Sequence, residues 1–125
     1  MQQLQFEASW DKALAAEDRL EIKRIFDETK RHDQSDIVFT PIREANNHEE
    51  ALLVTVLVHN FTNESLSFQN TRLLYSIQGE VIAEETFTLP ALSIPHKTSM
   101  PWTFIFPKGS YQQQSDIVNG HIRLI

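Results

Sequence analysis

Residues 100–107 read Met-Pro-Trp-Thr-Phe-Ile-Phe-Pro, and these eight residues indicate a strand, its two faces and its ends. Side chains two apart along a strand share one face. The face with the large side chains consists of Met100, Trp102, Phe104 and Phe106. Because proline has no N–H for a strand ladder, Pro101 and Pro107 suit the ends of the strand or an edge position. We therefore predict a strand with one very large apolar face.

This apolar face has two possible roles. In the core it would pack against a second sheet, whereas on the surface it would be an aromatic strip for a partner, since four such side chains form a large apolar patch. The other strands of the chain offer enough apolar faces to cover it. We expect the core position, with the exposed strip as the alternative.

The size and composition of the chain indicate one soluble domain over residues 1–125. The sequence has no cysteine, which excludes disulfides, thiolate metal sites and cysteine nucleophiles and fits a reducing cytoplasm. Residues 1–9 lack a basic start and an apolar run, so we expect no signal peptide. No stretch approaches the ~20 apolar residues that span a bilayer, so we also expect no membrane segment.

The charge pattern argues against nucleic acid as a partner. The net charge is −6, and six of the eleven basic residues lie between residues 9 and 33, among seven acids. The basic surface that phosphate backbones require is therefore missing, and anionic membrane surfaces are disfavoured for the same reason.

The spacing of apolar residues changes sharply, from a helical period over residues 9–32 to the alternation typical of strands over residues 36–125. Asp18, followed three residues later by Glu21, resembles a capping box that opens a second helical segment. If the helix were unbroken, Asp18 would fall on its apolar stripe. We therefore expect a break near Ala16.

The strand-like part contains about seven short strands, with turn signals every 8 to 12 residues or so. Residues 51–61 are apolar on both faces and are expected to form a central strand, while Gly79 marks a hairpin turn and residues 112–114 a polar loop. We predict a mainly β fold, an antiparallel immunoglobulin-like β-sandwich with an N-terminal helical segment. Residues 121–125 stop within a strand pattern, so it stays open whether Ile125 is the natural end.

The search for catalytic, cofactor and metal sites gives none. No pair of histidines has a metal-ligand spacing, and with no cysteine to assist, a zinc site is not expected. The histidines are His32, His48, His59, His96 and His121. No serine stands in a nucleophile elbow, and the three glycines form no phosphate-binding loop. We expect no enzyme and no cofactor, although an acid–base pair from distant positions stays open.

Four polar or aromatic residues have more than one interpretation. Trp10 either docks the helical segment onto the sheet or anchors a partner, and we expect docking. His59 is expected to be a polar residue at a strand end. Asn60 and Asn63 each begin an N-glycosylation pattern, but both lie in one turn, where asparagine is common for backbone reasons. We favour the turn role for both.

Several sequence blocks resemble the SLAP domain of Gram-positive bacilli, which is named for S-layer assembly proteins linked to the accessory Sec secretion system. The blocks that carry the resemblance include Ser9-Trp-Asp, Thr40-Pro-Ile-Arg-Glu-Ala, Leu52-Leu-Val-Thr-Val-Leu-Val-His-Asn and Pro101-Trp-Thr-Phe-Ile-Phe. They follow the family order and lie within residues 6–107. The proline-containing blocks are the more specific ones. Family members often carry two copies of the domain, and this chain holds one.

The resemblance implies a non-catalytic role in the export or assembly of S-layer proteins. The implied partners are an S-layer precursor or components of the accessory translocase, and the implied location is cytoplasmic, peripheral to the membrane at the secretion machinery. It assigns no partner-binding residues. We hypothesise that an extended segment of a partner adds to an open sheet edge.

Two other functions stay open. An inhibitor or regulator of another protein would use a rigid, proline-containing loop over residues 90–100. A small hydrolase would require a deep pocket with convergent polar groups.

Overall fold

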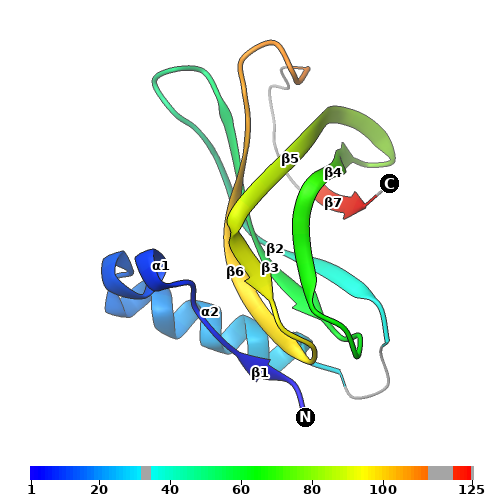
Figure 1. Cartoon of the computed structure of the whole chain (residues 1–125). Helices are drawn as coiled ribbons and strands as arrows, with labels where there is room; N and C mark the ends of the chain where they lie inside the picture. The colour runs from blue at the N-terminus through cyan, green and yellow to red at the C-terminus, as the bar shows by residue number, and fades with distance from the viewer. Residues whose placement is uncertain (32–34, 113–119, 125) are drawn as a thin grey trace.

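The computed structural model describes residues 1–31, 35–112 and 120–124. The elements in chain order are β1 (Gln3–Leu4), α1 (Ala8–Ala13), α2 (Ala16–Thr29), β2 (Ile37–Asn46), β3 (Leu52–Asn60), β4 (Leu66–Ile77), β5 (Glu80–Ile94), β6 (Thr98–Phe106) and β7 (Gly120–Leu124) (Figure 1). His32, Ile125 and residues 113–114 of the expected polar loop lie outside the described residues.

The described strands form two sheets, so the mainly β prediction is confirmed. Sheet A has the order β1-β6-β3-β2 and sheet B the order β5-β4-β7. The neighbours are antiparallel except β1, which runs parallel to β6. β3 lies inside sheet A, as its two apolar faces predict. The short β1 was not expected from the sequence.

The main core lies between the two sheets and contains most of the aromatic face of β6. Phe104 is completely buried, and its ring centroid lies 6.1 Å from that of Phe39, 5.6 Å from that of Phe68 and 5.3 Å from that of Phe87. These residues come from both sheets, so β6 holds the layers together through edge-on and tilted ring contacts. The predicted core position is confirmed, with Trp102 only half-buried.

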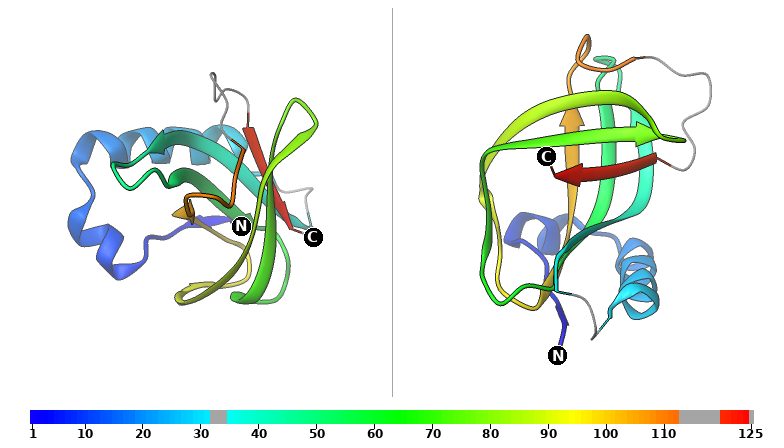
Figure 2. Two further views of the ribbon diagram at one scale, coloured as in Figure 1. Left: turned by 90° about the horizontal axis from the view of Figure 1, so that it is seen from above. Right: turned by 90° about the vertical axis from the view of Figure 1, so that its right-hand side faces the viewer.

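A second, smaller core lies where the helices pack on the outer face of sheet A, and Figure 2 shows both helices on this one side of the molecule. Ile22 and Phe26 are one turn apart on α2 and bury their side chains against Leu57 of β3. The expected break is confirmed, because Leu14 and Ala15 have extended backbone conformations between α1 and α2.

The capping-box prediction is wrong. Ala15 precedes α2 and makes no side-chain capping bond, whereas Asp18 lies inside the first turn. The carboxylate of Asp18 instead pairs with Arg43 of β2, at 3.1 Å. Asp18 therefore forms an ion pair with a distant strand, instead of the helix-capping bond that the local sequence predicted.

The rigid loop expected over residues 90–100 is also wrong, because β5 continues to Ile94 and β6 begins at Thr98. The pairing with β4 moves from Phe68 opposite Leu89 to Ser67 opposite Ser93, which makes a bulge that contains Pro90. Proline is tolerated there because β5 is an edge strand. Between these two strands only residues 95–97 remain outside the sheets, so the long loop that the inhibitor hypothesis placed over residues 90–100 is not observed.

Candidate functional site

The outer edge of β6 is only partly covered by the chain. β1 pairs with Thr98 and Ser99, and the Gln5 amide donates to the Ser99 carbonyl at 2.9 Å. Alternate residues of a strand direct their backbone groups to the same side. Pro101 therefore faces this edge without an N–H, and the ladder with β1 ends before it.

Beyond Pro101, Thr103 and Ile105 also direct their backbone groups to the outer edge, by the same alternation. Within residues 1–31, 35–112 and 120–124, no strand pairs with this part of β6 on that side. The side chain of Ile105 is 50% exposed, which is unusual for a large apolar residue of this chain. This end of β6 thus offers free backbone groups beside apolar surface.

Next to this edge, two cavities that share part of their lining lie along α1. One, of about 130 Å³, is lined by Trp10, Leu14, Asp18, Ile22, Ile42, Arg43, Thr55 and Thr103. The other, of about 370 Å³, is lined by Ser9, Trp10, Ala13 and Leu14. Because they share Trp10 and Leu14, we treat these cavities as one feature, the α1 groove.

Trp10 lines both parts of the α1 groove and contacts β6. Its ring stacks on that of Trp102, with the centroids 6.3 Å apart and the planes at 26°. Trp10 also packs against the small core under the helices. The docking role expected from the sequence is therefore observed, and the half-buried ring still contributes surface to the groove.

The polar groups that line the α1 groove already have partners within the chain, and Ser9 Oγ donates to Glu7 Oε1 at 2.7 Å. Arg43 contacts Asp18 at 3.1 Å and Glu21 at 4.0 Å, and the hydroxyls of Thr55 and Thr103 lie 2.7 Å apart. The remaining lining is mainly apolar. Such a surface favours an uncharged, apolar group, since a charged one would lose water without gaining a partner.

A chain of hydrogen bonds links Gln2, just before β1, and Thr29 of α2 to β6 and β3 of sheet A. His59 Nδ1 lies 2.6 Å from Ser99 Oγ, and His59 Nε2 lies 2.8 Å from Thr29 Oγ1. Thr29 Oγ1 donates to the Ile25 carbonyl at 2.6 Å, so His59 Nε2 must carry the proton and donate to Thr29. Gln2 Nε2 donates to Ser99 Oγ at 3.0 Å, which leaves the serine hydroxyl to donate to His59 Nδ1.

This bonding fixes a neutral imidazole inside the protein. His59 is 0% exposed and lies between the rings of Phe26 and Phe61. Burial lowers the pKa of His59 from 6.5 to about 4, because it penalises the charged form. His59 was expected as a polar residue near a strand end, and it does lie near the end of β3, but its burial was missed. The alternation Thr55, Leu57, His59 on the helix-facing side could have predicted it.

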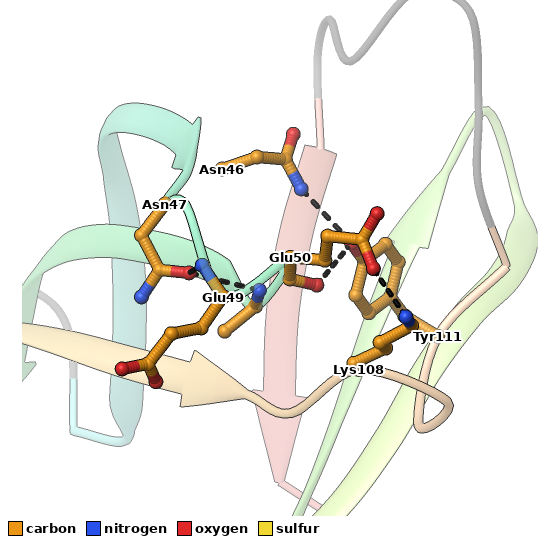
Figure 3. A network of polar contacts seen from close by, with 7 residues as sticks. Asn46, Asn47, Glu49, Glu50, Lys108 and Tyr111 are labelled. Atoms are coloured by element: carbon orange, nitrogen blue, oxygen red, sulfur yellow. Dashed lines mark hydrogen bonds and ion pairs between the residues drawn. The ribbon is translucent and has the colours of Figure 1, made fainter.

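At the end of the two-sheet structure opposite β1, Tyr111 joins the β2–β3 turn to the segment after β6 (Figures 1 and 3). Its hydroxyl donates to the Glu50 carbonyl at 2.7 Å and accepts from Asn46 Nδ2 at 3.0 Å. Asn47 Oδ1 holds the turn by accepting from the amides of Glu49 and Ala51, each at 3.0 Å.

The segment containing Tyr111 also covers part of the outer edge of β5. Tyr111 forms a bridge with Ala83, and the Gln112 amide donates to the Ile82 carbonyl at 2.8 Å. This edge is therefore partly closed by the chain itself, whereas the end of β6 has no such cover among the described residues.

The other candidate residues have structural positions. Asn60 is 0% exposed, and its Nδ2 donates to the carbonyls of Glu64, Ile94 and Pro95, so the turn role is confirmed for it. Asn63 is exposed in the same turn. In the described ranges, no group of three His, Asp or Glu side chains could hold a metal ion. None of the helices described is both long and apolar enough to cross a membrane.

Comparison with known proteins gives one match. A family model described as the SLAP domain matches residues 4–122, nearly the whole chain. The matched range includes β6, the α1 groove and the buried hydrogen-bond chain from Ser99 to Ile25. No curated protein and no solved structure matches this chain.

Proposed function

Because the chain belongs to the SLAP domain family, which indicates an S-layer-associated role, we propose that it is a non-catalytic protein-interaction module for S-layer proteins. In this proposal it assists their export through the accessory Sec system or their assembly. The partners are an S-layer precursor or components of the accessory translocase. The module acts in the cytoplasm, peripheral to the membrane at the secretion machinery.

The observation that supports an interaction role is the free end of β6 beside the α1 groove. An open strand edge offers main-chain hydrogen bonds to an extended partner, and an adjoining groove offers selectivity for its side chains. Proteins usually cover or interrupt such edges, as this chain does along part of β5. An uncovered edge next to apolar surface is therefore a reasonable place for a partner.

We also infer that the two sheets form an immunoglobulin-like sandwich, with the helices added to one outer face. Seven strands in two sheets around a shared core are compatible with this class. In such a fold, a partner surface at a sheet edge leaves the main core undisturbed.

The function can be tested by deleting the gene in a bacillus that has an accessory Sec system and an S-layer. S-layer precursor should then accumulate inside the cells and decrease at the surface, while a substrate of the general Sec pathway is exported normally. Re-expression of the wild-type chain should restore export. Unchanged export and assembly of the S-layer protein in the deletion strain would contradict the proposal.

A further inference from the structure

We propose that residues 1–14, which contain β1 and α1, form a hinged flap over the outer edge of β6, and that this flap opens to admit an extended segment of a protein partner. The flap is the blue N-terminal segment that ends with α1 in Figure 1. The inference deepens the proposed function and rests on it only in taking a protein as the partner. It adds the part of the chain that controls access to the edge.

The closed flap covers the edge of β6 at two places. β1 pairs with the start of β6, where the amides of Gln3 and Gln5 donate to backbone carbonyls at 3.0 and 2.9 Å. Farther along the strand, the ring of Trp10 stacks on that of Trp102, so it lies across the edge. Among the described residues, only the end of β6 near Ile105 stays uncovered on this side. A partner strand that reaches past this end therefore requires the flap to move.

The flap is held by few buried contacts. Among residues 1–14, all of which the structure describes, Gln2 alone is buried, and α1 has no buried residue. The flap side chains that pack against the small core under the helices are only partly buried: Leu4, Phe6, Trp10 and Leu14. Segments with few buried side chains open locally at a lower free energy than the core. The flap is thus suited to open while both sheets stay folded.

A hinge and a latch lie at the boundary with α2. Leu14 and Ala15 have extended backbones, so α1 does not continue into α2 and can turn about this point. Arg19 of α2 is the latch. Its guanidinium donates to Asp11 Oδ1 and to the Asp11 carbonyl, both at 2.9 Å, and lies 4.9 Å from the centroid of the Phe6 ring. One exposed side chain thus holds both α1 and the segment before it.

Opening the flap removes both obstacles to a partner strand. The ring of Trp10 moves away from the edge together with α1, and the Ser99 carbonyl loses its bond from β1. β1 stops before Pro101, whereas a longer segment can pair with Ser99 and continue to Thr103. The partner therefore makes backbone bonds that the flap cannot make, which favours the exchange of one strand for the other.

The seat that the flap leaves defines the chemistry of the incoming segment. Side chains two apart along a strand share a face, and Gln2, Leu4 and Phe6 all face the body of the domain. Gln2 Nε2 donates to the Asn60 carbonyl at 3.1 Å and to Ser99 Oγ at 3.0 Å. We expect a segment with an amide side chain, followed at alternate positions by two apolar side chains.

Arg19→Ala tests the latch, and Arg24→Ala is its matched control. Both remove an exposed arginine from α2, but Arg24 pairs with Glu28 of the same helix, at 2.7 Å. We expect Arg19→Ala to raise the open population about fivefold, because it removes an exposed ion pair and a cation–π contact. The amides of Gln3 and Gln5 should then exchange hydrogen about fivefold faster, as NMR can measure, and Arg24→Ala should not change them.

Trp10→Ala distinguishes a flap that opens as one unit from a fraying β1. It removes the contact with Trp102, which lies in α1 and not in β1. If residues 1–14 open together, this substitution should also speed exchange at Gln3 and Gln5 by about fivefold or more. If β1 frays alone, the two amides should exchange at the wild-type rate, which would overturn the flap.

A disulfide lock tests whether the flap controls access. The chain has no cysteine, so Gln3→Cys combined with Thr98→Cys introduces a single pair. The two positions are directly opposite in the ladder of β1 and β6, and neighbouring strands have the spacing that a disulfide requires. Oxidation should hold the flap closed, and the reduced form of the same variant is the control.

The probes are a synthetic peptide of residues 1–7, whose sequence is the one seated in the structure, and ten-residue peptides that tile an S-layer precursor. Because only the open form binds, the observed Kd rises as the open population falls. Arg19→Ala should therefore bind about fivefold more tightly than the wild type, and Arg24→Ala equally to it. The oxidised lock should bind about tenfold more weakly or worse, and reduction should restore binding.

The outcomes separate the flap from the function. If the oxidised lock binds precursor peptides as tightly as its reduced form, the flap is overturned and the proposed function stands. If the peptide of residues 1–7 binds as expected and no precursor peptide binds, the flap is supported and the function is contradicted. Absence of binding of every peptide to Arg19→Ala at about 5 mM would overturn the inference, because this exceeds the effective concentration of a tethered segment.

Discussion

Acidification should destabilise the fold through His59. The imidazole is held neutral between Ser99 and Thr29, and burial lowers its pKa from 6.5 to about 4. In the unfolded chain the same side chain would titrate at about its ordinary value. Between these two pKa values the unfolded state binds more protons than the folded state, so stability falls as the pH falls.

The size of the effect follows from the difference between the two pKa values. The full effect is about 3 kcal/mol, since a shift of roughly 2.5 pKa units corresponds to 1.36 kcal/mol per unit. This stability is fully present above about pH 7.5 and is lost progressively as the pH falls through 6.5 towards 4. At pH 5 the expected loss is about 2 kcal/mol.

The assay is urea unfolding of the wild type and of His59→Gln, followed by circular dichroism at half-unit steps from pH 8 to pH 4. Glutamine keeps an amide that can donate to Thr29 and a carbonyl that can accept from Ser99, but it does not titrate. Subtracting the two curves of unfolding free energy against pH removes the other titrating groups. The remaining curve should fall by about 2 kcal/mol between pH 8 and pH 5.

The difference between the two unfolding free energies should therefore change with pH. If it changed by less than about 0.5 kcal/mol between pH 8 and pH 5, the assigned role of His59 would be refuted. A protonated His59 in the folded state at pH 6, seen in the ring nitrogen shifts by NMR, would refute it directly. The NMR spectrum should instead show the neutral form with the proton on Nε2.

Two other substitutions test the packing and the turn. Gly120→Ala would place a Cβ 1.9 Å from Tyr75 Oη, so the free energy of unfolding should fall by about 2 kcal/mol or more. The same substitution should cost clearly less in a Tyr75→Val background. Equal losses in both backgrounds would show that Tyr75 is not the obstacle. Asn60→Ala would remove the Nδ2 donor of the Ile94 and Pro95 carbonyls, while the Glu64 carbonyl keeps its bond from Thr62 Oγ1, so we expect a loss of about 2 kcal/mol in urea unfolding. A loss below about 0.5 kcal/mol would contradict the role of Asn60 in joining β3 to the β5–β6 connection.

The sequence predicts the β6 strand well because its signal is local. Large side chains alternate with smaller ones from Met100 to Phe106, and this period alone identifies the face that becomes the core. The break between α1 and α2 was predicted for a similar reason, since Asp18 would interrupt the apolar stripe. Both features depend on neighbouring residues only.

Features that depend on distant residues were missed or wrong. Pro90 marks either a turn or an edge bulge, and only the strand order shows that β5 is an edge. Gln3 and Leu4 are too few to show any period, so their parallel pairing with β6 has no local signal. The hydrogen bonds of the buried His59 ring come from Thr29 and Ser99, which lie 30 and 40 residues away.

The candidate site was predictable in part. Trp10 was singled out from its sequence context, and its docking role is observed. The open end of β6 was not, because a free edge results from the order of strands in a sheet and from where β1 stops. An edge for strand addition was expected in general, but its position required the three-dimensional structure.

Hydrogen exchange of individual backbone amides would test the central claim most directly. The amides of Thr103 and Ile105 face the open edge, so in the free protein they should exchange quickly, while those of Trp102 and Phe104, bonded to β3, should exchange slowly. On addition of a bound S-layer precursor peptide, Thr103 and Ile105 should become protected. If a peptide binds and these two amides still exchange as fast as in the free protein, the partner does not pair with β6.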